Sequence, residues 1–165
     1  MSAINDPTAP LDSEHIAKQQ LRRAHELAVR ASIADVASYV QQLLGQKWTA
    51  YLAGVSDARA VGKWANGGRK PQPESERKLR DAYQIAVLIS LVDDEPTARA
   101  WFSGMNPVLG HRAPAWVIAN WDDGGDRAME AALAFIALRL LIPGLPRSES
   151  PCPASNRRPA QRHRR

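Results

Sequence analysis

Three side chains within residues 48–67 have the types and the spacing to contact nucleic acid. Arg59, Lys63 and Asn66 recur at intervals of three and four residues, so they share one face of a helix. The two cationic side chains of this face would attract the phosphate backbone. The opposite face carries small and apolar residues, namely Ala58, Val61, Gly62 and Ala65. This arrangement favours a helix that packs on its own domain and faces a DNA groove. A solvated basic helix of any helical protein is the alternative.

A helix-turn-helix would position these side chains. We expect a short helix from Trp48, a tight turn at residues 53–55, and a second helix that begins at Ser56, a residue type suited to the N-cap. Asn66 and two glycines follow, and such residues tolerate the left-handed conformation that ends a helix. Further contacts with DNA are predicted at the helix starts and in the following loop: Lys47, Ser56, Arg69 and Lys70. Residues 69–73 suit a phosphate-contacting wing and an ordinary exposed linker equally.

Charge is unevenly distributed along the 165 residues, whose formal net charge is +5. Residues 41–80 hold eight basic and three acidic side chains, whereas residues 81–145 hold four basic and eight acidic ones. The last twenty residues hold six arginines and one glutamate. Because attraction to phosphate supplies much of the affinity for DNA, the basic middle segment strengthens the interpretation of residues 48–67 as a DNA-binding element.

The sequence carries no recognisable catalytic or metal-binding motif, so we predict neither an enzyme nor a bound cofactor. The chain has no P-loop and no HExxH sequence, and its histidines are scattered: His15, His25, His111 and His163. The single cysteine, Cys152, lies between two prolines, which excludes an internal disulfide. No apolar run approaches the roughly 20 residues that span a membrane, and the N-terminus lacks a signal-peptide pattern. We therefore expect a cytoplasmic protein without membrane contact.

Helical periodicity recurs along the chain and no stretch alternates like a strand, so we predict an all-α fold of about seven helices. Residues 1–11 are expected to be a flexible arm, and residues 143–165 a disordered tail rich in proline and arginine. Between them we expect a helix-turn-helix region at 12–92 and a smaller helical region at 93–142. The other predicted helices are 12–30, 33–44, 74–92, a short one ending at Gly104, 114–120 and 126–141.

Two local signals indicate how the first helices begin and pair. Ser32 and Asp35 have the spacing of a capping box, which predicts a helix start at residue 33. The predicted helix 12–30 carries an apolar stripe: Ile16, Leu21, Ala24 and Leu27. That stripe suits the core of the domain, and it also suits the same helix of a second copy, since many DNA readers are two-fold dimers.

Three segments follow one another between Leu52 and Ile118: LAGVSDARAVGKW, KLRDAYQIA and AWFSGMNPVLGHRAPAWVI. Together they resemble the Xre-type antitoxins of the Xre/MbcA/ParS family, which are the partners of RES-domain toxins in bacterial type II toxin–antitoxin pairs. The resemblance covers residues 30–140. Its more specific part is a Trp-containing helix, an Asn-Pro turn, and a proline that opens the next helix: Trp101, Asn106, Leu109, Gly110 and Pro114.

The resemblance implies a two-part protein. Residues 30–92 would bind operator DNA and repress the protein's own operon, and residues 93–140 would cover a RES-type toxin and block its NAD-degrading active site. The chain would act as a homodimer within a hetero-oligomer. Eight residues separate Val55 from Trp64, one more than the commoner spacing, which predicts a shifted or lengthened second helix. The alternatives are a transcription regulator without a toxin or with another protein partner, and an adaptor that no longer binds DNA.

Overall fold

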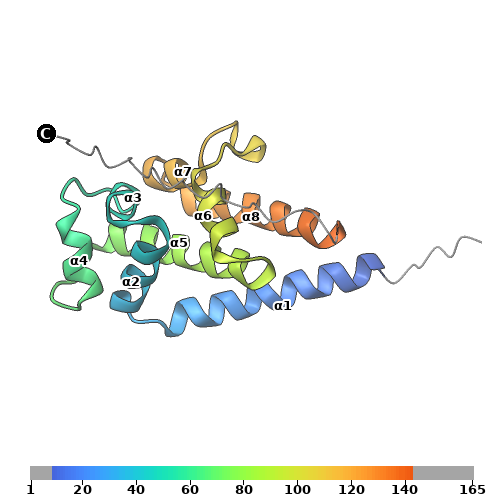
Figure 1. The fold of residues 1–165 in the computed structure, drawn as a ribbon, viewed down its shortest axis with the longest axis horizontal. Coiled ribbons are helices and arrows are strands. Elements are labelled where there is room, and N and C mark those ends of the chain that lie inside the picture. Colours follow the sequence, from blue (N-terminus) through green and yellow to red (C-terminus); the bar gives the residue numbers. More distant parts are fainter. Residues whose placement is uncertain (1–8, 143–165) are drawn as a thin grey trace, which may run out of the picture.

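The computed structural model describes residues 9–142 and confirms an all-α fold (Figure 1). This part of the chain forms eight α-helices and one short 3-10 helix, with no strand. The elements are α1 (Ala9–Arg30), α2 (Ile33–Leu44), α3 (Gln46–Leu52), α4 (Arg59–Ala65), α5 (Pro73–Val92), α6 (Glu95–Ser103), η1 (Pro107–Leu109), α7 (Pro114–Asn120) and α8 (Gly124–Leu141). The helix α1 begins before the predicted residue 12, and α8 before the predicted residue 126. Residues 1–8 of the predicted arm and the predicted tail, 143–165, lie outside the described residues.

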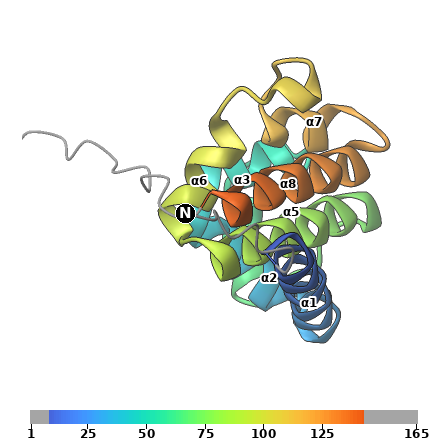
Figure 2. The same cartoon turned by 90° about the vertical axis from the view of Figure 1, so that its right-hand side faces the viewer.

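The helix α5 runs through the middle of the fold. Its buried side chains recur at the spacing of one helix face: Leu79, Ala82, Ile85, Ala86 and Ile89. The helices α1, α2 and α8 pack around it, and α6 and α7 also contact it (Figures 1 and 2). Residues from both predicted regions, 12–92 and 93–142, therefore share one hydrophobic core.

The start of α2 follows the predicted capping box. The N–H of Asp35 donates to Ser32 Oγ at 3.1 Å, and Ser32 Oγ donates to the Asp35 carboxylate at 2.6 Å. Gly45 ends α2 as the sequence predicts, and its φ of 85° lets α3 begin at the next residue. These two local signals fix the direction in which α2 enters and leaves the core.

Three cationic side chains bind the carboxyl ends of helices. Lys78 Nζ donates at 3.0 Å to the carbonyl of Ala119 in the last turn of α7. Arg80 donates to two carbonyls at the end of α1 and just after it, and Arg99 donates to two at the end of α2, at 2.6 and 3.4 Å. Each contact places positive charge at the negative end of a helix dipole and satisfies a carbonyl that lacks an intrahelical partner. The long helix α5 and the shorter α6 are thus joined to their neighbours by polar contacts as well as by the core.

The carboxyl group of Asp81 is partly buried where α5 meets the start of α8, beside Gly125. Burial raises the pKa of Asp81; Asp126 adds to this rise, whereas Arg77 opposes it. Because the folded protein disfavours the ionised form, stability decreases as the pH rises through this raised pKa. We expect Asp81→Asn to raise Tm at about pH 7 and to leave it nearly unchanged at about pH 3, below the range where carboxyls ionise. Circular dichroism melts measure this, with exposed Asp122→Asn as the control. A Tm difference that is equal at both pH values would contradict the expectation.

Candidate nucleic-acid interface

The turn between α3 and α4 is built around one glycine. Gly54 has a φ of 74°, a left-handed conformation that few other residues adopt without strain. Its N–H donates to Tyr51 O at 3.0 Å and so reverses the chain after α3. Ser75 Oγ of α5 donates to Ala53 O at 2.8 Å, which fastens the turn to the core. The turn therefore lies at residues 53–55, where the sequence predicts it.

The predicted start of the second helix at Ser56 is wrong. The helix α4 begins at Arg59, and Ser56 caps none of its N–H groups. Asp57 does so instead, because the N–H of Arg59 donates to Asp57 Oδ1 at 3.0 Å. An aspartate accepts from the backbone two residues later more strongly than a serine does. The extra residue between Val55 and Trp64 consequently lengthens the connection, and α4 itself has only seven residues.

The buried face of α4 is centred on Val61 and Trp64, which are 0% and 4% exposed. The sequence predicts Val61 on this face together with Gly62 and Ala65, but these two are only partly buried. Burial of a large indole is more favourable than burial of a glycine or an alanine, so Trp64 determines which face of α4 packs against the core. The predicted outer face, which carries Lys63, is nevertheless exposed.

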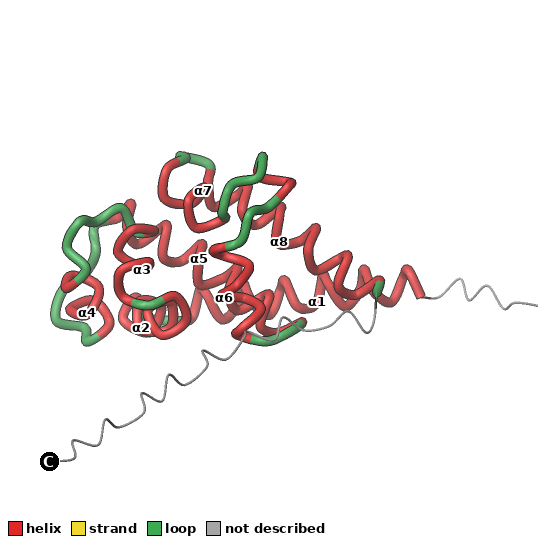
Figure 3. The backbone as a smooth tube through the Cα atoms, turned by 45° about the horizontal axis from the view of Figure 1, so that its top comes forward, coloured by secondary structure: helices red, strands yellow, loops and turns green. Residues whose placement is uncertain are grey.

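The predicted contacts on α4 and in the loop after it are exposed: Arg59, Lys63, Asn66, Arg69 and Lys70. The N–H groups of Gly68 and Arg69 donate to Lys63 O at 2.9 and 3.3 Å, which folds the loop back onto the end of α4. Ser56, Arg69 and Lys70 line one hollow of about 370 Å³ between the two connections of α4, which lie side by side at one end of the molecule (Figure 3). The structure therefore brings the loop cations together with α4 on one surface.

Two predicted contacts have different surroundings. Arg59 Nε lies 3.1 Å from the carboxylate of Asp57 in an exposed ion pair. The backbone N–H of Arg59, followed by its guanidinium, lowers the pKa of Asp57. Exposed pairs of this kind are weak, so the guanidinium can still turn toward a phosphate. Lys47 lies apart from the loop cations, in the first turn of α3, where it borders a depression that faces α7.

Part of the basic excess of residues 41–80 serves the fold. Arg77, Lys78 and Arg80 of α5 each donate to backbone carbonyls of other elements. Lys78 and Arg80 also form ion pairs with glutamates one turn earlier in α5. The positive charge that faces solvent is therefore smaller than the sequence predicts. The exposed cations of this segment lie on α3, on α4, in the loop before α5, and at Arg77 of α5.

The five residues predicted as a toxin-binding motif build the connection between α6 and α7. Trp101 and Leu109 are buried, and Pro114 opens α7. Asn106 Oδ1 accepts from the N–H two residues later at 2.9 Å, and Gly110 reverses the chain with a φ of 63°. All five therefore shape and hold this connection, and their neighbours form its surface.

Sequence reasoning missed the exposed apolar residues on this side of the molecule. Met105 is 79% exposed and Val108 is also exposed, both on the α6–α7 connection that projects from the body (Figure 1). Trp48 and Tyr51 are exposed on α3. A signal for these two was present, because residues three apart share a helix face, and Leu52 already supplies the buried face of this short helix.

No family model, no curated protein and no solved structure matches this chain. Within residues 9–142, no helix has both the length and the apolar character needed to cross a membrane. In the same described part of the chain, no three His, Cys, Asp or Glu side chains gather closely enough to hold a metal ion.

Proposed function

We propose that this protein is an antitoxin that binds a RES-type toxin and its own operator DNA. The observation that carries the DNA part is the exposed surface of Lys63, Arg69 and Lys70, held together by the hydrogen bonds that fold the loop onto α4. Among the described residues, none of these three cations has an ion-pair partner, so their charge is directed to solvent. Such a surface would bind the phosphate backbone. In this proposal Arg59, at the start of α4, would reach base edges, since the first residues of a recognition helix enter the groove.

The support for a protein partner comes from the α6–α7 connection. It belongs to the segment that resembles the toxin-binding region of Xre-type antitoxins, and its buried motif residues hold the exposed Met105 and Val108 outward. Exposed apolar residues on a projecting, internally bonded loop are typical of a contact surface. We infer that this loop forms part of the surface that covers the toxin.

Co-expression with the protein encoded beside the gene, which this proposal expects to be a RES-type toxin, tests this function. We expect the full chain to restore growth and cellular NAD. Met105→Glu together with Val108→Glu should abolish both, because carboxylates buried in an apolar contact cost several kcal/mol. Lys63→Glu with Lys70→Glu introduces the same number of carboxylates on the DNA-facing surface and should preserve NAD. If the unmodified chain leaves NAD depleted, the antitoxin function is excluded.

A protein-binding adaptor without DNA contact is the second candidate. Six residues connect α3 to α4, more than the three or four of an ordinary helix-turn-helix, and two basic residues of α5, Lys78 and Arg80, are engaged inside the fold. Both observations favour a scaffold that no longer binds DNA. A gel-shift assay at low salt with the DNA upstream of the gene separates the candidates, since an adaptor leaves this DNA unshifted. A regulator without a toxin would shift it but fail the co-expression test.

A further inference from the structure

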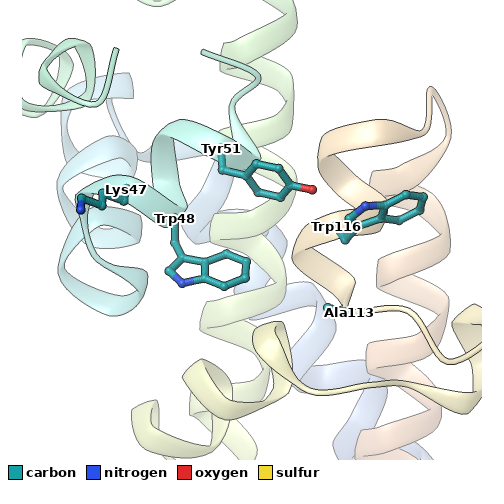
Figure 4. Close-up of a pocket in the computed structure, with 5 residues that line it drawn as sticks. All are labelled: Lys47, Trp48, Tyr51, Ala113 and Trp116. Atoms are coloured by element: carbon teal, nitrogen blue, oxygen red, sulfur yellow. The ribbon is translucent and has the colours of Figure 1, made fainter. Parts of the chain in front are cut away.

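A shallow cleft of about 390 Å³ lies between α3 and α7. Trp48 and Tyr51 of α3 line one side, Ala113 and Trp116 line the other, and Lys47 lies at the edge (Figure 4). The walls are almost wholly apolar. Since α3 belongs to the helix-turn-helix and α7 to the segment with the toxin-binding resemblance, any occupant would contact both parts of the protein.

The aromatic side chains of α3 lie outside the hydrophobic core that anchors this helix. Thr49, Ala50 and Leu52 are buried and attach α3 to the core, whereas Trp48 is 47% and Tyr51 41% exposed. Large apolar surface that faces water is unfavourable, and clusters of it mark contact sites more often than isolated residues do. The cleft therefore has the character of a binding surface.

The cleft is already formed in the free protein. Asn120 Nδ2 donates to Tyr51 Oη at 3.0 Å and to Trp116 O at 2.8 Å, which links α7 to α3 across the cleft. The guanidinium of Arg112 lies 4.2 Å from the ring centroid of Trp116, and Trp48 packs edge to face against Tyr51 at 5.9 Å between centroids. Side chains that are held in place before binding lose less conformational entropy when a partner docks.

The charge at the cleft indicates the chemistry of its occupant. Lys47 is the one charged side chain among the described residues that line it, and no acidic side chain of that part of the chain does so. A second copy that docked through the same cleft would bring Lys47 against its own counterpart. Residues 143–165 of the chain, with six arginines and one glutamate, would also be repelled. An acidic segment of another protein would be attracted.

We propose that the cleft binds a segment of the partner protein in which a large apolar side chain is flanked by Asp or Glu. The apolar side chain lies among Trp48, Tyr51 and Trp116, and the carboxylates face Lys47. Tryptophan, tyrosine and arginine are the residues that dominate the energetics of protein interfaces. This inference deepens the proposed function and rests on it in one respect, namely that the chain has a protein partner.

Selection of random linear peptides displayed on phage, with the full-length chain as target, tests this chemistry without the toxin. We expect the selected peptides to combine Leu, Phe or Trp with Asp or Glu. Their affinity should fall at least about tenfold with Trp48→Ala, which removes an apolar wall. Lys47→Glu should weaken binding about tenfold and flatten its salt dependence. Lys18→Glu, an equal charge change on α1, should leave binding unchanged. Lys47 is exposed, so its variant tests the cleft even if the tryptophan variant fails to fold.

Three outcomes would overturn the inference. The selected peptides could be basic or proline-rich, or their affinity could be unchanged by both Lys47→Glu and Trp48→Ala. The chain could also self-associate in a way that Trp48→Ala abolishes. The co-expression assay keeps this inference separate from the proposed function. If NAD is restored and both cleft variants bind the toxin as tightly as the unmodified chain, the cleft inference fails and the antitoxin function stands. If acidic peptides bind at the cleft while NAD stays depleted, the antitoxin function fails and the cleft inference stands.

Discussion

Replacement of Lys63, Arg69 and Lys70 by glutamine is expected to weaken binding to the DNA upstream of the gene by at least about tenfold. The slope of log affinity against log salt should also become less steep by about three, because each lost cation releases one counterion fewer. All three side chains are exposed, so their loss should leave the fold intact. Fluorescence anisotropy of labelled duplex DNA over a range of salt concentrations measures both quantities.

A matched control separates local contacts from the effect of net charge. Lys18, Arg22 and Arg23 are exposed on α1, and their replacement by glutamine removes the same total charge from another helix. We expect only a small loss of affinity from this control, because screening weakens attraction beyond about 10 Å at ordinary salt. Equal losses of affinity in both triple variants would show that DNA binding depends only on the net charge of the protein. Unchanged binding in the first variant would exclude α4 and its loop as the DNA surface.

The helical fold was predictable from the sequence where the determining signals are local. Each of these signals acts only on residues close to it in the sequence. They are the cap formed by Ser32 and Asp35, the glycine at residue 45, and the prolines that open α6 and α7. The start of α4 was not predictable in this way, since Ser56 and Asp57 are both good caps and only one can be used. Asp57 is used, and Trp64 then reaches the core.

The exposed cations of the candidate site could be predicted from the sequence. Which other cations bind carbonyls within the fold could not. Lys63 and Arg69 follow from periodicity and from the loop composition, and both are exposed. Whether a cation instead meets a carbonyl inside the fold depends on which helix ends beside it. Lys78 meets the end of α7, about forty residues later in the chain, and Arg80 meets the end of α1. Charge along the sequence carries no information on such long-range contacts, so it overestimates the basic surface.

The largest loss of stability is expected from Gly124→Ala, at the start of α8. A Cβ there would lie 2.2 Å from Val117 O and 2.8 Å from Ile118 Cα, both backbone atoms of α7. A backbone cannot yield as the end of a flexible side chain does, so α7 must move away from α8 and open the core between them. Overpacking of this kind costs about 1–3 kcal/mol and occasionally more, and we expect the upper end of that range. Urea unfolding followed by circular dichroism measures it.

Gly62→Ala in α4 is the matched control, because it adds the same methyl group to a helix that has room for it. The nearest atom to its Cβ would be Gln46 Nε2 at 3.6 Å, an ordinary contact. Alanine is the better helix former, so this variant should keep or raise the stability by up to about 1 kcal/mol. The two variants should also differ in binding: displacement of α7 moves Trp116 and disrupts peptide binding at the cleft, whereas a change within α4 does not. If Gly124→Ala retains both the stability and the peptide binding of the unmodified chain, the close contact between the backbones of α7 and α8 at Gly124 is contradicted.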